Sequence, residues 1–330
     1  MIDAKPAAVG IVNPLTLVGT ELRFILRERA FPLAKVILMD STGAAAGSLA
    51  PVGEESATVV PISDGVLEDC DVVFFCGPTE GNRKWIKRDV QNKFVAIDLS
   101  QPVPATEGKL AVAGVNAEEL SAADRLLVSP HPAAIPIAII LKQVERVVPV
   151  ELCTATIVQP AAVFEELGVE GLAHEPVNVP KIQNVLHEVL DRSLASNLFP
   201  ARERNEDLIK QHIRALTDAN TQLALLVTQG TVFHGHTFSL FVKTKEELSV
   251  DQITATLRAN VAIAFAEGDQ AFGTIDAAGK DEVLIAEVRS DASIRGGFWV
   301  WAVCDNLRRS SALNAVLVAE KVLFGSGMTN

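Results

Sequence analysis

Residues 7–26 read AAVGIVNPLTLVGTELRFIL, and this stretch decides the fold. Residues 7–12 form a short apolar run that ends at a turn, which is the pattern of a buried strand. After the turn, apolar residues recur at helical spacing from Val18 to Leu26. A strand, a turn and a helix in this order open a βαβ unit. The stretch therefore predicts a parallel sheet with helices packed on it.

The same pattern repeats downstream. Further short buried strands are expected at residues 35–39, 72–76, 94–97 and 126–129, and residues 133–147 are apolar and helical in character. Short strands alternating with helices are typical of a doubly wound, mostly parallel sheet. We expect an α/β fold whose first domain, residues 1–130, is of the Rossmann type that binds dinucleotides.

The pattern changes beyond about residue 148. Alternating apolar and polar residues predict longer strands at 151–158, 237–243, 283–288 and 298–303. Residues 167–204 show no strand signal and contain a predicted helix at 181–194. Strands with one polar side indicate a mixed or antiparallel sheet with helices on one face. We expect a second α/β domain at residues 131–309, followed by a C-terminal segment, 310–330, whose helix covers 310–324.

The charge balance narrows the classes of partner. The chain has 29 basic and 41 acidic residues, for a net charge of -12, and 48% of its residues are hydrophobic. An acidic surface repels phosphate backbones and anionic lipids, so we expect neither nucleic-acid nor membrane binding. The longest apolar stretch, residues 132–141, is about half the ~20 residues that span a bilayer.

The cysteines and histidines give no metal or disulfide pattern. The four cysteines are scattered, which indicates a reduced, cytoplasmic protein. The N-terminal residues include Asp3 and lack a basic flank before an apolar run, so no secretory signal is expected. His234 and His236 lie two residues apart without a carboxylate cluster, and we therefore expect no metal site.

Several motifs together resemble one enzyme family. Residues 301–316 read WAVCDNLRRSSALNAV, which is similar to the W-x-V-x-D-N-L-R-K-G-A-A-L-N-A-V segment of aspartate-semialdehyde dehydrogenases. Residues 9–19, VGIVNPLTLVG, resemble the family's V-G-I-V-G-A-T-G-A-V-G, and residues 97–100, IDLS, resemble its I-D-N-S. Gln159 falls at its Y-Q-A motif and His236 at its G-H motif. The resemblance covers nearly the whole chain in order.

The resemblance implies a Rossmann domain that binds NAD or NADP and a second domain for catalysis and dimerisation. It therefore implies a homodimer formed through the second domain, and a last helix that packs back on the first domain. The positions that match the cofactor site are Gly10, Asn13, Thr16, Leu17, Val18, Gly19, Asp40, Gly77 and Asn306. Asp40 ends a strand and could accept hydrogen bonds from ribose hydroxyls, which favours NAD over NADP.

The chain departs from the family where the chemistry occurs. The family's N-P-N-C-S-T motif corresponds to residues 129–134, SPHPAA, so Pro132 stands where the nucleophilic cysteine belongs. We interpret Pro132 as part of the first turn of a helix, where proline is well tolerated. Gln229 replaces the arginine that grips the substrate carboxylate, and residues 206–210, with Lys210, are the nearest match to the family's E-E-x-K helix. Asn13 and Thr16 replace two glycines of the phosphate loop. These losses resemble the usg-like branch of the family.

The sequence is compatible with three hypotheses about the function. The first is a family member without the parent activity, which binds NAD(P) or another small molecule. The second is an oxidoreductase that transfers hydride non-covalently to a small carbonyl compound, with His236 or His131 as proton donor. Cys76, at the end of a predicted strand, is a separate candidate for a replacement nucleophile, and a small buried hydrophobic role is favoured for it. The third is a non-catalytic subunit that pairs with an active dehydrogenase. We favour the first, in which His236 keeps a structural role.

Overall fold

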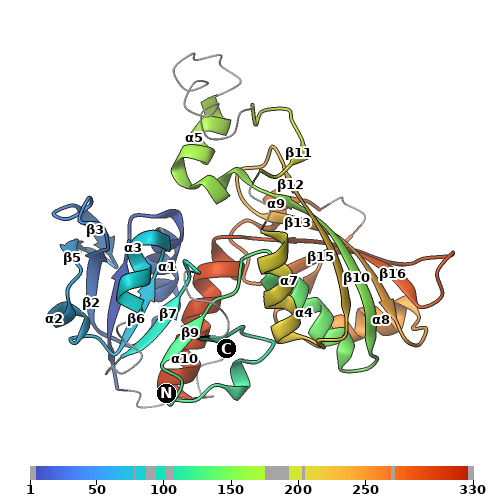
Figure 1. Ribbon diagram of the computed structural model, residues 1–330, viewed down its shortest axis with the longest axis horizontal. Coiled ribbons are helices and arrows are strands. Elements are labelled where there is room, and N and C mark those ends of the chain that lie inside the picture. The colour runs from blue at the N-terminus through green and yellow to red at the C-terminus, as the bar shows by residue number, and fades with distance from the viewer. Residues whose placement is uncertain are drawn as a thin grey trace. The chain divides into compact units, whose positions relative to one another are not determined.

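The computed structural model describes residues 5–77, 79–86, 94–101, 107–174, 193–202, 205–268 and 272–325 (Figure 1). The chain divides into two compact units. Unit 1 combines Met1–His131 with Ser311–Asn330, and unit 2 is Pro132–Ser310. Apart from its last two positions, the helix predicted at residues 181–194 lies outside the described residues.

Unit 1 contains a parallel sheet of seven described strands in the order β5-β2-β1-β6-β7-β9-β8. The strands are β1 (Ala7–Val12), β2 (Leu33–Asp40), β5 (Val60–Pro61), β6 (Val72–Phe75), β7 (Val95–Asp98), β8 (Lys109–Leu110) and β9 (Leu126–Val128). A small hairpin, β3 (Leu49–Val52) and β4 (Glu55–Thr58), lies outside it. The helices are α1 (Leu17–Glu28), α2 (Asp64–Leu67), α3 (Thr79–Ile86), a 3-10 turn (Ala117–Glu119) and α10 (Leu313–Phe324). The strand order reverses between β1 and β6, which is the crevice where such sheets bind ligands.

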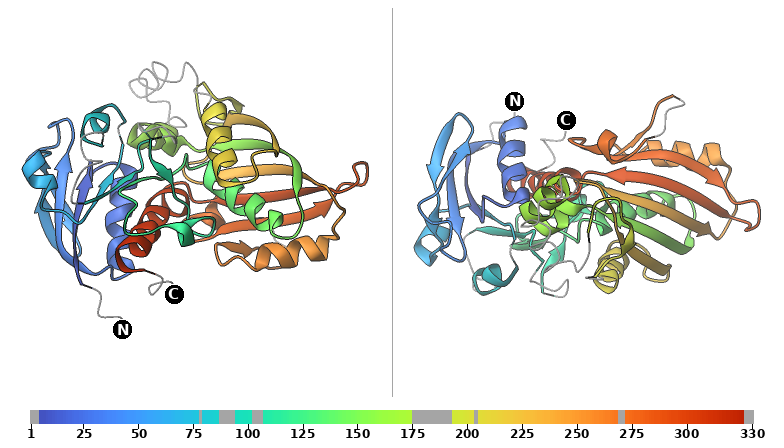
Figure 2. Two further views of the ribbon diagram at one scale, coloured as in Figure 1. Left: turned by 60° about the horizontal axis from the view of Figure 1, so that its bottom comes forward. Right: turned by 90° about the horizontal axis from the view of Figure 1, so that it is seen from above.

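Helix α10 completes the core of unit 1 although it comes from the end of the chain. Apolar residues of α1 and α10, including Leu22 and Val316, share one buried cluster with the sheet. Figure 2 shows the two helices side by side, in agreement with the edge-to-face contact of Phe31 and Phe324. Arg29 donates two hydrogen bonds to Glu320, at 2.9 and 2.8 Å. Apolar burial and a bidentate ion pair thus hold α10 in this unit.

Unit 2 contains a mixed sheet of seven described strands in the order β11-β12-β10-β13-β16-β15-β14. The strands are β10 (Val150–Gln159), β11 (Phe199–Pro200), β12 (Gln222–Gln229), β13 (His236–Thr244), β14 (Ile263–Phe265), β15 (Val283–Ser290) and β16 (Gly297–Cys304). The helices are α4 (Ala134–Glu145), α5 (Glu165–His174), α7 (Glu206–Leu216), α8 (Val250–Arg258) and α9 (Thr274–Ala277), with a 3-10 turn (Ala161–Phe164) and a π-helical turn (Arg308–Ala312). β10 pairs in parallel with β12 and β14 with β15, whereas the other pairings are antiparallel.

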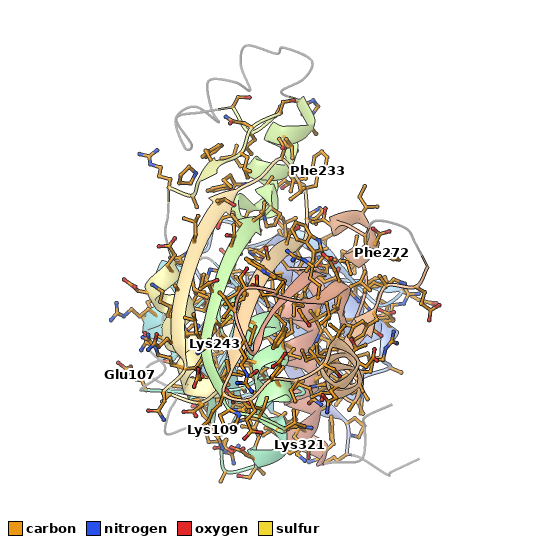
Figure 3. The ribbon with its side chains drawn as sticks, turned by 90° about the vertical axis from the view of Figure 1, so that its right-hand side faces the viewer. Glu107, Lys109, Phe233, Lys243, Phe272 and Lys321 are labelled. Atoms are coloured by element: carbon orange, nitrogen blue, oxygen red, sulfur yellow. The ribbon has the colours of Figure 1, made fainter. Side chains whose placement is uncertain are left out.

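Alternation along the strands gives the sheet of unit 2 two different faces. On β10, Cys153, Ala155 and Ile157 are buried, whereas Thr154 and Thr156 between them are at least partly exposed. Helices α4, α7 and α8 contact these strands and one another. Figure 3 shows the strands of this sheet with their side chains. Phe233 lies just before the start of β13, and Lys243 lies near the other end of that strand.

The predicted α/β architecture, with a Rossmann-type sheet followed by a mixed sheet, is confirmed. The absence of a strand signal in residues 167–204 was misleading, because β11 occupies Phe199–Pro200 and pairs with β12. Two residues are too few to show alternation, so this strand exists only through its partner. Pro132 lies in a turn and α4 begins at Ala134, so the assignment of Pro132 to the first helical turn is wrong by two residues.

No helix in the described part of the chain is long and apolar enough to cross a membrane.

His212 on α7 makes unit 2 sensitive to acid. Its side chain is 1% exposed, and burial lowers the pKa of His212 from 6.5 to about 4. An unfolded chain takes up this proton below pH 6.5, whereas the folded protein resists until about pH 4. The free energy of unfolding should therefore fall as pH drops through this window, by at most about 3 kcal/mol from this residue.

We predict that His212→Gln flattens the loss of stability between pH 6.5 and pH 4, because the substituted side chain does not titrate. Urea unfolding at several pH values measures the slope. His174→Gln, at an exposed histidine, is the matched control and should keep the wild-type slope. If the free energy of unfolding falls equally steeply with pH in the wild type and in His212→Gln, the acid sensitivity does not come from His212.

Candidate functional site

The turn after β1 is organised by the side chain of Asn13. Asn13 has a φ of +57°, a left-handed conformation that asparagine adopts more easily than most residues. Its Nδ2 donates to the carbonyl oxygen of Cys76 at 2.9 Å and to Oδ1 of Asn82 at 3.1 Å. Its Oδ1 accepts from the backbone N–H and the hydroxyl of Ser41, both at 3.0 Å. One amide therefore joins the carboxyl ends of β1, β2 and β6 to α3.

The network continues along the sheet through Asn82. Its Nδ2 donates to the carbonyl oxygen of Cys76 at 2.5 Å and to the hydroxyl of Ser100 at 2.9 Å, and that hydroxyl donates to Oδ1 of Asp98 at 2.9 Å. Helix α3 also packs closely on this edge, because a Cβ at Gly81 would lie 2.4 Å from Oγ of Ser41. The sequence did not predict Asn82 or Ser41, since nothing in their spacing marks them as neighbours of Asn13.

Helix α1 begins with a side-chain cap. Thr16 Oγ1 accepts from the backbone N–H of Gly19 at 3.1 Å and donates to the carbonyl oxygen of Asn13 at 3.0 Å. A Cβ at Gly19 would lie 2.6 Å from that same carbonyl oxygen, so only glycine fits here. Leu17 and Val18 form the first turn of α1. The turn therefore keeps the close approach of a dinucleotide-binding turn, while a threonine holds one of its N–H groups.

The other predicted cofactor positions of unit 1 lie near this edge. Gly10 is central in β1, where a Cβ would come within 2.7 Å of Met39 Cε. Asp40 ends β2, and its Oδ2 accepts from Thr42 Oγ1 and from the N–H of Ala45, both at 3.1 Å. Gly77 follows β6 with open space around it. One carboxylate oxygen of Asp40 thus accepts hydrogen bonds from the loop that follows β2. Its binding of a ribose stays a prediction.

The start of α4 offers no nucleophile. Ala133 is the N-cap residue of α4, and its methyl group cannot accept a hydrogen bond. Pro132 precedes it, and its ring has neither a thiol nor a titratable group. Both Ala133 and Ala134 are buried. The turn preserves a helix start and contains no side chain that could attack a carbonyl carbon.

Gln159 and Gln229 bind each other. The two residues end the paired strands β10 and β12 in register. Nε2 of Gln159 donates to Oε1 of Gln229 at 2.9 Å. Nε2 of Gln229 donates to the carbonyl oxygens of Gln159 at 3.2 Å and Gly230 at 3.1 Å. Gln229 is 1% exposed and both of its amide hydrogens are used, so its side chain has no donor left for a substrate carboxylate.

His236 stands at the start of β13, next to a glycine held by Asn306. Gly235 has a φ of +86°, and its N–H donates to Oδ1 of Asn306 at 2.7 Å. His236 is buried, with its ring 5.8 Å from that of Phe238. Asn306 therefore fixes the turn before His236, and its predicted contact with a cofactor stays a prediction.

The neighbouring residues of the D-N-L-R segment also hold the backbone of unit 2. Oδ1 of Asp305 accepts from the N–H groups of Leu307 and Arg308, both at 2.9 Å, and its Oδ2 accepts from that of Gly279 at 2.9 Å. Arg308 Nε donates to Asp281 at 2.6 Å. The most recognisable motif of the chain therefore connects the end of β16 with the segment between α9 and β15.

The remaining predicted residues lie apart from these networks. Lys210 on α7 lies 3.7 Å from Asp207, one helical turn earlier. His131 is half-buried immediately before Pro132. Cys76 is fully buried, which disfavours it as a nucleophile. Among the described residues, no group of three His, Cys, Asp or Glu side chains is placed to hold a metal ion.

A parallel sheet with a dinucleotide-type turn in one unit, and a mixed sheet with G-H and D-N-L-R segments in the other, define a two-unit α/β protein of the dehydrogenase class. Residues 8–123 match the family described as "Semialdehyde dehydrogenase, NAD binding domain". Residues 166–309 match "Semialdehyde dehydrogenase, dimerisation domain". The chain belongs to the semialdehyde dehydrogenase family, and the predicted resemblance is confirmed.

Individual relatives match along almost the whole chain. Aspartate-semialdehyde dehydrogenase from Rickettsia bellii is 23% identical, over 97% of this chain and 98% of the relative. A "USG-1 protein homolog" from Pseudomonas aeruginosa is 26% identical over the same shares. A probable aspartate-semialdehyde dehydrogenase from Pseudomonas aeruginosa has a solved structure with a TM-score of 0.87 and 26% identity, covering 96% of this chain and 98% of that one.

Proposed function

We propose that this protein is a homodimeric member of the semialdehyde dehydrogenase family that does not catalyse the thiol-dependent reaction of its relatives. That reaction needs a nucleophile and a cationic partner for the substrate carboxylate. Pro132 supplies no nucleophile at the start of α4. Gln229 matches the position of the family's carboxylate-binding arginine. It is buried and hydrogen bonded to Gln159.

The locked pair of glutamines is the observation that carries the proposal. A missing cysteine alone leaves room for a substitute nucleophile acting on the same bound substrate. Gln229, however, donates its amide hydrogens to the backbone carbonyl oxygens of Gln159 and Gly230. Releasing it to bind a ligand would remove the partner of the Gln159 amide and of the Gly230 carbonyl oxygen, at a cost of about 1–3 kcal/mol. Nucleophile and substrate clamp are therefore both missing.

We predict that Pro132→Cys alone does not restore phosphate-dependent oxidation of aspartate semialdehyde, because Gln229 still cannot hold a carboxylate. Turnover of the wild type and of this variant should stay at least about 10⁴-fold below that of an active family member. Formation of reduced nicotinamide cofactor measures the rate. Thiol labelling confirms that the new cysteine is reachable, and Pro132→Ala controls for folding. Robust turnover, or an acyl adduct on the wild type, would sink the proposal.

We further propose that unit 1 holds a dinucleotide only weakly. Glycine-rich turns let the cofactor approach the backbone at the carboxyl edge of the sheet. Here the side chains of Asn13 and Asn82 bridge that edge, and Thr16 holds the N–H of Gly19. The residues present therefore do not fit a tightly bound NAD or NADP.

Asn13→Gly combined with Thr16→Gly should increase binding of NAD or NADP, because the change reopens the turn and frees an N–H at the start of α1. We expect 1 mM dinucleotide to change the melting temperature of the wild type little and to raise that of the double variant by several degrees. Each protein is compared with itself without ligand, and Asn220→Gly, in an exposed turn, serves as control. An equal rise for the wild type would contradict weak binding.

The open face of the sheet in unit 2 supports a homodimer. Two rows of side chains cross this face in register. One row is Leu226, Thr156, Ser239 and Trp301, and the next is Ala224, Thr154, Phe241 and Trp299. Leu226 is 47% and Trp301 40% exposed. Exposed tryptophan is enriched at interfaces between proteins.

Trp301→Lys is predicted to convert the dimer into monomers, because a charge at the centre of a buried face is left without a partner. A central aromatic residue commonly contributes 2 kcal/mol or more, which corresponds to a dissociation constant raised about 30-fold or more. Analytical ultracentrifugation measures the dimer fraction. Leu49→Lys, at an exposed residue of the hairpin in unit 1, is the control. A monomeric wild type would refute the interface.

A further inference from the structure

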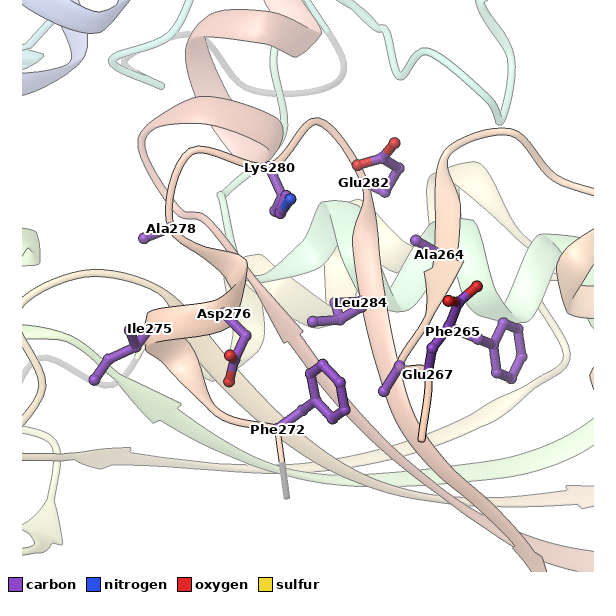
Figure 4. Close-up of a pocket in the computed structure, with 11 residues that line it drawn as sticks. Ala264, Phe265, Glu267, Phe272, Ile275, Asp276, Ala278, Lys280, Glu282 and Leu284 are labelled. Carbon is purple, nitrogen blue, oxygen red and sulfur yellow. The ribbon is translucent and has the colours of Figure 1, made fainter. Parts of the chain in front are cut away.

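Unit 2 contains a cavity that the family resemblance does not explain. It has a volume of about 590 Å³ and lies between the short helix α9 and strands β14 and β15. Figure 4 shows Phe272, Leu284, Asp276 and Lys280 around the same space. This volume falls in the range of sites for small organic ligands. The cavity lies within unit 2, beside the segment between α9 and β15 that Asp305 and Arg308 hold.

The floor of the cavity is apolar. Leu284 on β15 packs with Val303 and Ala277 in a small cluster, and Ala264 and Phe272 pack against it. Phe265 on β14 also lines the cavity, and its ring is stacked by the guanidinium of Arg258, 4.4 Å from the ring centre. Aromatic and aliphatic walls of this kind take up an apolar group from water.

The charged groups at the cavity have few partners within the described residues. Neither Lys280 nor Glu267 forms a side-chain hydrogen bond or ion pair there. Asp276 accepts from the N–H of Gly273 at 2.8 Å through one carboxylate oxygen. A cation and two carboxylates therefore face an apolar cavity with bonding capacity to spare.

Glu282 is the third carboxylate at the cavity. Burial lowers the pKa of Arg309, and nearby acidic groups, including Glu282, raise it. Glu282 is thus one of the acidic groups near the buried Arg309. Figure 4 shows Lys280 and Asp276 both on the α9 side of the cavity, with Glu267 across from them, just after β14.

We propose that this cavity binds a free amino acid with a large apolar side chain. The carboxylate of the ligand would pair with Lys280 and its ammonium with Asp276, which both lie on the α9 side of the cavity. The apolar side chain would lie on Phe272 and Leu284. A dianionic ligand such as a phosphate ester meets two carboxylates and is repelled, whereas a zwitterion satisfies both signs of charge. The proposal does not depend on the loss of the parent activity.

Titration calorimetry with the full-length protein tests the site. We expect phenylalanine to bind with a dissociation constant on the order of 1 mM, as befits a small ligand in an open cavity. Phenethylamine lacks the carboxylate and 3-phenylpropionate lacks the ammonium, so each should bind about tenfold more weakly or worse. Equal binding of the three compounds would overturn the pairing of charges.

Matched variants locate the binding. Lys280→Met and Asp276→Asn should each weaken phenylalanine binding about tenfold or more, since each removes one charge-assisted bond. The asparagine in Asp276→Asn still has a side-chain oxygen that can accept a hydrogen bond from the N–H of Gly273. The controls are Lys245→Met, at an exposed lysine, and Asp251→Asn, an acid in the first turn of α8 as Asp276 is in α9. Controls that bind like the wild type support the site.

Hydrogen exchange gives an independent readout of position. Phenylalanine should slow exchange in residues 263–268 and 272–285 and leave the rest of the chain unchanged. No binding up to 20 mM phenylalanine, unaltered binding by Lys280→Met and Asp276→Asn, or protection confined to other segments would each overturn the proposal.

Discussion

A buried amide must find hydrogen-bond partners, and this constraint decides what the two candidate sites of the chain can do. Asn13 satisfies it by bridging the ends of three strands, and Gln159 and Gln229 satisfy it with each other and with two backbone carbonyl oxygens. In each case the amide is part of the hydrogen-bond network of the fold. The amides of Asn13 and Gln229 are buried, and both amide hydrogens of each are donated within the fold.

The same reasoning gives the D-N-L-R segment a structural role that does not depend on catalysis. Asp305 and Asn306 accept hydrogen bonds from backbone N–H groups at four residues, and Arg308 pairs with Asp281. These contacts close unit 2 between the end of β16, the start of β13 and the segment after α9. Their removal would expose unpaired backbone groups whether or not a reaction takes place. A retained motif is therefore weak support for retained catalysis.

The sequence predicted most of the fold because the long strands and helices carry their own periodicity, as β1, α1 and β10 do. It missed β11, whose two residues have no period, and it placed Pro132 two positions too far into α4. The chemistry of the candidate site was only half visible. The absence of a cysteine can be read from residue 132 alone, whereas the Asn13–Asn82 and Gln159–Gln229 pairs join residues 69 and 70 positions apart. Such pairs depend on strand order and register, which a single sequence does not contain.

Unit 1 is assembled from both ends of the chain, and this has a consequence for synthesis on the ribosome. The cluster around β1 and α1 stays open to water until α10 arrives, because Val316 and its neighbours supply one wall of that cluster. Arg29 likewise has its partner Glu320 only 291 residues further along the chain. Unit 2 is contiguous and can fold while translation continues. The first part of the chain to be made is thus the last to be completed, and its apolar surface stays exposed for most of the synthesis.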